Sequence, residues 1–194
     1  MNTMETNIAI VYFSGYGHTK KQAEAVELGA RSAADMKVES IAIDKEGNLS
    51  DADWVTLAKA DAIIFGSPTY MGGPAWQFKK MADTSSKVWH SQGWKDKIAA
   101  GFTNSGSPSG DKFSTLSYMH TLAMQHGMIW IGLGLMPASK KENTRNDVNW
   151  LGGFSGALAQ SPADSSTEEG PLPGDLETAR IFGKRVADYA KKTR

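Results

Sequence analysis

A short loop near the N-terminus carries the residue types that bind a phosphate group. It follows the apolar run 8–13 and precedes a segment in which Ala23, Val26 and Ala30 recur at helical spacing. A phosphate ester binds well to backbone N–H groups and small hydroxyls at a helix N-terminus, and glycine lets the backbone approach it closely. We therefore predict a phosphate site formed by Ser14, Gly15, Tyr16, Gly17, His18 and Thr19.

The same loop has an alternative interpretation as a dinucleotide fingerprint. That fingerprint is G-x-G-x-x-G, and its third glycine allows the helix to pack closely on the strand. Lys20 occupies the third position here. Asp44, after the next predicted strand, could still serve as the acid that binds a ribose. The missing glycine favours a mononucleotide, and Asp44 keeps the dinucleotide alternative open.

Two later loops repeat the pattern of glycine, proline and small hydroxyl residues. One follows the apolar run 62–65 and the other follows the run 98–102. Backbone amides beside a flat apolar surface suit a planar ring that forms hydrogen bonds. We therefore expect these loops to surround the ring of a cofactor whose phosphate binds to the first loop. The candidate residues are Pro68, Thr69, Tyr70, Met71, Gly72, Asn104, Ser105, Gly106, Ser107, Pro108 and Ser109.

A few other side chains are candidates for the neighbourhood of the ring. Gln125 and His126 precede the last apolar run and could lie near the ring with Tyr70, although a lone histidine such as His126 is more often a structural residue. Trp89 and Trp94 either wall a pocket or pack in the core. The chain has no cysteine and no histidine–carboxylate spacing typical of a metal site. The sequence therefore predicts neither thiolate chemistry nor a metal.

The elements that must position these loops alternate along the chain. The runs 8–13, 62–65, 98–102 and 128–131 are apolar at successive positions, as strands buried on both faces are. Segment 38–43 is a weaker strand with polar positions. Helical patterns between them make this order typical of a three-layer, doubly wound α/β fold with five parallel strands. Ligands bind such sheets beyond the carboxyl ends of the strands, which is where the three loops fall.

The C-terminal part departs from this alternation. Segment 133–174 is rich in Gly, Ser, Pro and Asn, and we interpret it as a long excursion over the site or toward a partner subunit. A last helix follows, which Asp175 is expected to cap. Ser50 and Asp53 similarly predict the start of an earlier helix. Since the sequence contains neither a repeat nor a second core, we predict a single domain over residues 1–194.

Charge and hydropathy exclude several classes of partner. Lys and Arg total 21, and Asp and Glu also total 21, which gives no argument for nucleic acid or for a membrane surface. No apolar run approaches the roughly 18 residues that cross a bilayer. The stretch Met1–Asn7 is polar, unlike the apolar part of a signal peptide. These features predict a cytoplasmic protein.

The motifs resemble those of flavodoxin-like FMN proteins, most of all the NAD(P)H:quinone oxidoreductases of the tryptophan-repressor-binding-protein type. The segments that carry the resemblance lie in the same order as in that family, at 11–19, 63–70, 103–107, 122–128 and 151–153. The resemblance implies the strand order 2-1-3-4-5, with the FMN phosphate at residues 14–19. It also implies that Trp89 lies near the substrate, often across a subunit interface, in a homodimer or homotetramer.

The resemblance implies an activity as well. Bound FMN would pass two electrons, as a hydride, from NADH or NADPH to a quinone-type acceptor. The main alternative is a flavodoxin-type electron carrier that docks to redox partner proteins. Carriers of this fold tend to be strongly acidic, so the equal charges favour the enzyme. A flavin-binding regulatory protein without turnover is the remaining alternative.

Overall fold

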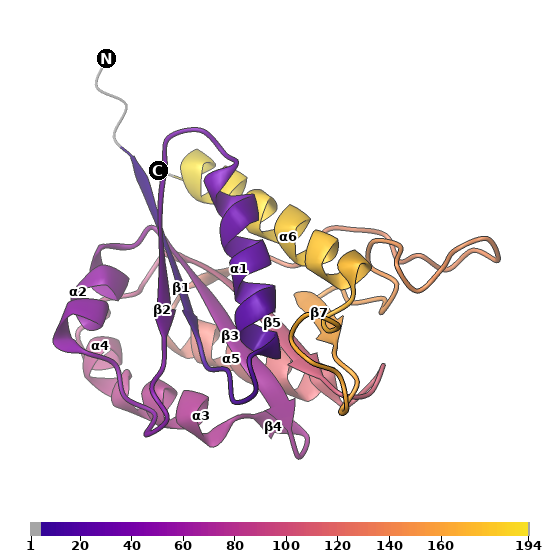
Figure 1. Ribbon diagram of the computed structural model, residues 1–194. Coiled ribbons are helices and arrows are strands. Elements are labelled where there is room, and N and C mark those ends of the chain that lie inside the picture. The colour runs from indigo at the N-terminus through magenta and orange to yellow at the C-terminus, as the bar shows by residue number, and fades with distance from the viewer. Residues whose placement is uncertain (1–4, 194) are drawn as a thin grey trace.

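The computed structural model describes residues 5–193 and folds them as a parallel sheet with helices on both faces (Figure 1). The strands of the central path are β2 (Met36–Ala42), β1 (Thr6–Tyr12), β3 (Ala62–Tyr70), β5 (Ile98–Ser105) and β6 (Ile129–Trp130), in that spatial order. The predicted order 2-1-3-4-5 is confirmed, because β4 lies outside this path. Most of the polar stretch Met1–Asn7, on which the cytoplasmic prediction partly rests, lies outside the described residues.

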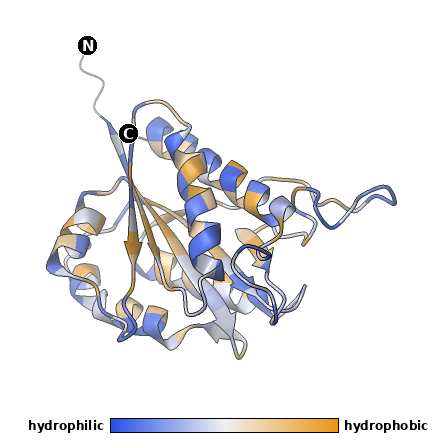
Figure 2. Ribbon diagram, in the orientation of Figure 1, coloured by the Kyte–Doolittle hydropathy of each residue, from blue (hydrophilic) through white to orange (hydrophobic). Residues whose placement is uncertain are grey.

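Two groups of helices bury the two faces of the sheet. The first face carries α1 (His18–Arg31) and α6 (Pro173–Lys192). The second carries α2 (Asp51–Lys59), α3 (Trp76–Thr84) and α5 (Lys112–Gln125), with the short α4 (Ser86–His90) following α3. Figure 2 shows the result, with hydrophobic strands inside and hydrophilic helix faces outside. None of the helices in residues 5–193 is long and apolar enough to cross a membrane.

The second predicted loop, residues 66–74, is more regular than a plain loop. Strand β3 continues through Tyr70, because Ser67 and Pro68 still pair with β5. The chain then turns at Met71 and Gly72 into β4 (Gly73–Pro74), an antiparallel partner of β3. Met71 and Gly72 have φ angles of 48° and 77°. Positive φ at both central positions is typical of a tight hairpin turn.

The position beside β5 is shared by two short strands. Strand β6 pairs with the start of β5, and β7 (Ala157–Gln160) pairs with its end. Residues 131–156 connect them and include the long projection on the right of Figure 1; we call this segment the arm. The predicted excursion over 133–174 therefore contains a strand, which its short, partly polar sequence did not indicate.

A partly buried ion pair fastens the arm to the rest of the domain. The guanidinium of Arg145 donates two hydrogen bonds to the Asp175 carboxylate, at 3.0 and 2.7 Å. Asp175 also accepts the backbone N–H of Gln160 at 2.8 Å. The prediction that Asp175 caps the last helix is wrong, since α6 begins after Leu172 and this cation captures the carboxylate.

The predicted start of the earlier helix is confirmed. Ser50 Oγ accepts the N–H of Asp53 at 3.2 Å, and the Asp53 carboxylate accepts the N–H of Ser50 at 2.9 Å. Both bonds satisfy polar groups at the start of α2, and together they form a capping box.

Helices α1 and α6 touch at backbone distance. A Cβ atom placed on Gly29 would lie 1.8 Å from the carbonyl oxygen of Arg180. One placed on Gly183 would lie 2.0 Å from the carbonyl oxygen of Val26. This close crossing fixes the axis of α1, and with it the loop at the N-terminus of that helix.

Candidate functional site

A pocket of about 600 Å³ opens beyond the carboxyl ends of β1, β3 and β5. The predicted loops supply three of its walls, and a segment after β7 supplies the fourth. The lining residues from the predicted loops are Tyr16, His18, Thr19, Pro68, Thr69, Tyr70, Asn104, Ser105 and Gly106. Those from the fourth wall are Ser161, Pro162, Ala163, Ser165, Ser166 and Thr167. The pocket therefore unites loops that are far apart in the sequence.

The first loop has the geometry of an anion site. Ser14 Oγ accepts the N–H groups of Gly17 and Lys20, each at 3.1 Å, which leaves its own hydrogen free to be donated. Gly17 has a φ of 93°, and α1 starts at the next residue. The first N–H groups of a helix have no acceptor within it, so those of His18 and Thr19 remain available to a ligand. Together with the helix dipole they suit a phosphate.

Asp44 does not take part in this site. Its carboxylate accepts the backbone N–H of Asn48 at 2.6 Å, and this bond holds its pKa below the ordinary value. Within the described chain it is not among the residues that line the pocket. Asp44, the candidate acid of a dinucleotide fingerprint, therefore binds the backbone of its own turn and lies outside the pocket lining.

The wall of the pocket formed by β3 and β5 is built on a buried cluster of threonines. Thr69 Oγ1 lies 2.8 Å from Thr103 Oγ1 and 2.7 Å from Thr115 Oγ1, which joins β3, β5 and α5. Above this cluster, Tyr70 and Tyr16 meet edge to face with ring centroids 6.1 Å apart. Their exposed fractions are 37% and 79%, so an apolar aromatic wall faces solvent at the mouth of the pocket.

The fourth wall of the pocket is formed by residues 161–172, which we call the strap. The sequence predicts only a long excursion over 133–174, and the structure shows that the strap packs over the start of α1. The Nδ1 atom of His18 lies 2.8 Å from the carbonyl oxygen of Gly170, and Lys21 pairs with Glu168 at 3.1 Å. At its other end, Ser161 Oγ donates to Asn104 Oδ1 at 3.1 Å. The only sequence feature that indicated this wall is its content of serine and threonine, which resembles that of the other pocket loops.

Part of the third predicted loop serves another purpose. Ser107, Pro108 and Ser109 are outside the pocket lining formed by residues 5–193. Their carbonyl oxygens instead accept hydrogen bonds from Nζ of Lys112, at 3.1 Å for Pro108 and 3.4 Å for Ser109. Lys112 is 1% exposed, and burial lowers its pKa to about 8. These three carbonyl groups therefore bind a buried lysine, and the prediction that the three residues contact a cofactor remains a prediction.

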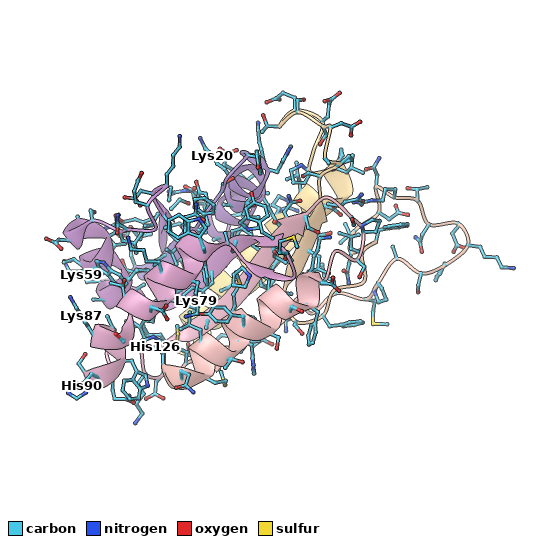
Figure 3. The ribbon with its side chains drawn as sticks, turned by 90° about the horizontal axis from the view of Figure 1, so that it is seen from below. Lys20, Lys59, Lys79, Lys87, His90 and His126 are labelled. Atoms are coloured by element: carbon cyan, nitrogen blue, oxygen red, sulfur yellow. The ribbon has the colours of Figure 1, made fainter. Side chains whose placement is uncertain are left out.

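Gln125, His126 and Trp89 lie together at a different place. They border a hollow of about 280 Å³ with Ser85 and Leu122. His126 precedes β6, whose Ile129 pairs with the first residue of β5, so it lies near the amino ends of the strands. Figure 3 shows His126 well away from Lys20 in the first turn of α1. The sequence predicts Gln125 and His126 near the ring, but in a single chain these two residues and Trp89 lie away from the pocket.

Within this hollow, His126 is a structural residue. Ser85 Oγ donates to the carbonyl of Ala82 at 2.6 Å and lies 2.9 Å from Nε2 of His126, which therefore donates to it. The imidazole packs on Trp94, with centroids 4.4 Å apart. Trp94 itself is fully buried and packs in the core, while Trp89 is 44% exposed.

We predict a pH-dependent loss of stability from His126. Burial lowers the pKa of the folded imidazole below its ordinary 6.5. Below pH 6.5 the unfolded chain then binds more protons than the folded one. As the pH is lowered from 6.5 toward the pKa of the folded imidazole, the free energy of unfolding should decrease by up to about 1.4 kcal/mol per pH unit. Urea unfolding at pH 8 and pH 5 measures this slope. His126→Gln should flatten it and exposed His90→Gln should not; equal slopes in all three would contradict the assignment.

The fold and the pocket define a flavodoxin-like FMN protein. The sheet has the flavodoxin strand order, the helix start and hydroxyls suit a phosphate, and the aromatic wall suits a planar ring. The chain belongs to the NADPH-dependent FMN reductase family, whose model matches residues 16–143.

Individual relatives agree with this assignment. The chain is 50% identical over 178 residues to flavodoxin FldP of Pseudomonas aeruginosa, covering 92% of this chain and 93% of that protein. It is 31% identical over 203 residues to an NAD(P)H dehydrogenase (quinone) of Geotalea daltonii, covering 95% and 97%. The crystal structure of a WrbA-like flavodoxin from Agrobacterium tumefaciens superposes with a TM-score of 0.79 at 47% identity, covering 98% of this chain and 100% of that one.

Proposed function

We propose that the chain is an FMN-dependent oxidoreductase that transfers two electrons from NADH or NADPH to a quinone-type acceptor. The observation that carries this proposal is the open, aromatic mouth of the pocket beside a phosphate loop. A donor and an acceptor can stack at such a mouth in turn. Homologues named NAD(P)H dehydrogenase (quinone) at about 31% identity support the same activity.

The residues of the pocket have distinct roles in this proposal. The N–H groups of His18 and Thr19, with the hydroxyls of Ser14 and Thr19, hold the phosphate. Pro68–Tyr70 and Asn104–Gly106 border the ring from two sides. When bound, FMN supplies the hydride chemistry, and the protein orients and tunes it. Tyr16 and Tyr70 present a flat surface at the mouth against which the nicotinamide or quinone packs.

The proposal is tested on the purified protein. We expect a yellow protein that binds one FMN per chain and consumes NADH or NADPH when benzoquinone is added. A colourless protein that binds no FMN on titration would refute the cofactor site. Bound FMN without quinone-dependent turnover would refute the enzyme and leave the site intact.

A one-electron carrier is the second candidate, supported by the relative named flavodoxin FldP at 50% identity. The same sample distinguishes the two functions. A carrier should show little turnover with benzoquinone, and reduction with dithionite should proceed in two separate one-electron steps. The enzyme should be reduced by NADH or NADPH in a single two-electron step.

We further propose that a homodimer or homotetramer completes the site. Trp89 is exposed beside Gln125 and His126 and is distant from the pocket of its own chain. It can therefore contribute to a substrate site only in a neighbouring subunit. Light scattering should give a dimer or tetramer mass, and Trp89→Ala should raise the KM for quinone with little change in FMN affinity. A monomer with full activity would contradict this.

A further inference from the structure

A buried lysine lies directly behind the loop that borders the ring. The side chain of Lys112, in the first turn of α5, passes beneath residues 107–109, and its ammonium group donates to three successive carbonyl oxygens. The preceding residues 104–106 of the same loop line the pocket. A three-donor cation at the centre of a loop fixes its backbone, because a buried carbonyl without a donor costs free energy.

The loop is held from its other side by the ion pair that fastens the arm. Gln160 Nε2 donates to the carbonyl of Gly106 at 3.0 Å, and Gln160 Oε1 accepts from Arg145 at 3.3 Å. The charged groups that face Lys112 are therefore Asp175 from α6 and Arg145 from the arm. Their charges offset each other, so the ammonium of Lys112 is the uncompensated charge behind the loop.

We propose that Lys112 is a positioning residue for the cofactor: its ammonium group holds residues 107–109, and through them keeps the preceding residues 104–106 in the shape that borders the FMN ring. This inference rests on the proposed function, since it assigns a support to the same site. Lys112 acts through the loop carbonyls and contacts neither the ring nor the substrate. Neutral lysine has one donor fewer and a lone pair that repels a carbonyl oxygen, so deprotonation should loosen the loop.

The proposal predicts a particular pH dependence of cofactor affinity. Burial lowers the pKa of Lys112 to about 8, opposed by Asp175 and reinforced by Arg145. If tight binding needs the ammonium form, the Kd for FMN should rise about tenfold between pH 7 and pH 9. The phosphate of FMN is almost fully ionised over this range, so it contributes little.

The experiment is a titration of the apoprotein with FMN at pH 7 and pH 9, followed by flavin fluorescence. Lys112→Met should bind FMN about tenfold more weakly at pH 7 and show no further loss at pH 9. Lys112→Arg, which stays charged, should also show no pH dependence while binding more tightly than Lys112→Met. Lys59→Met changes an exposed lysine on α2, labelled in Figure 3, and should behave as wild type.

Hydrogen exchange separates this inference from the proposed function. In the apoprotein, the amides of residues 105–110 should be about tenfold less protected in Lys112→Met than in wild type at pH 7, while those of α1 are unchanged. Equal protection, or the same pH ratio of Kd in Lys112→Met and wild type, would overturn the role of Lys112. A wild-type protein that binds no FMN overturns the proposed function instead, and the exchange result still decides about Lys112.

Discussion

Replacing Gly17 with valine should raise the Kd for FMN by roughly 100-fold, or about 2.7 kcal/mol. The φ of 93° is strained for any residue with a Cβ atom, and most of all for a β-branched one. A Cβ atom would also lie 2.6 Å from a methyl carbon of Thr167 in the strap. Either the loop or the strap must move: the loop carries the donors proposed for the phosphate, and the strap lines the same pocket. Fluorescence titration of the apoprotein measures the change.

Gly152 provides the matched control for this substitution. Its φ is 69°, and the nearest atom to a Cβ placed there, in Pro137, is 3.8 Å away. Gly152→Val therefore introduces similar backbone strain in the arm, far from the phosphate loop. We expect Gly152→Val to lower the thermal midpoint of unfolding about as much as Gly17→Val does. Its Kd for FMN should stay within about twofold of the wild-type value. An unchanged FMN affinity in Gly17→Val would mean that the phosphate binds elsewhere.

The largest expected effect on stability comes from Gly29→Ala. In an ordinary helix interior this change stabilises by about 1 kcal/mol, because alanine has the higher helix propensity. Here the added methyl would lie 1.8 Å from the carbonyl oxygen of Arg180, well inside van der Waals contact. Helices α1 and α6 would have to separate and open voids in a close-packed core. We expect a loss of about 3 kcal/mol or more in the free energy of unfolding.

Urea unfolding, monitored by circular dichroism, tests whether Gly29→Ala destabilises the protein instead of stabilising it. Leu28→Ala, at the neighbouring position of α1, removes a much larger side chain that is 62% exposed. It should change the free energy of unfolding by no more than about 0.5 kcal/mol. A Gly29→Ala protein as stable as wild type would show that the two helices do not pack at backbone distance in solution.

The shape of the loop 14–19, for which we propose phosphate binding, was predictable because its determinants are local. Ser14, Gly17 and Thr19 lie within six residues, between a buried strand and a helix, and the geometry follows from that junction alone. The strap was not predictable to the same degree. Its contacts with His18 and Asn104 join residues separated by 152 and 57 positions, and no short-range pattern specifies such partners.

The same distinction explains the corrections. Asp175 looks like a helix cap from its neighbours alone, but Arg145, 30 residues earlier, captures its carboxylate. The contact of Lys112 with the carbonyls of residues 107–109 is local, but composition alone does not show that this lysine is buried beneath the loop. His126 comes just before an apolar strand, whereas the pocket loops come just after one. It therefore lies at the amino ends of the strands, opposite the pocket.

The amino-acid sequence by itself determined the alternation of strands and helices, the strand order through family resemblance, and the turn of the loop 14–19 into α1. These follow from apolar periodicity and from interactions between residues close in the chain. Only the tertiary structure decided which loops meet, because that depends on how helices pack across the sheet. The crossing of α1 and α6 at Gly29 and Gly183 and the strap beside Gly17 are contacts between segments that are distant in the sequence. Their free energy exists only once the chain has folded.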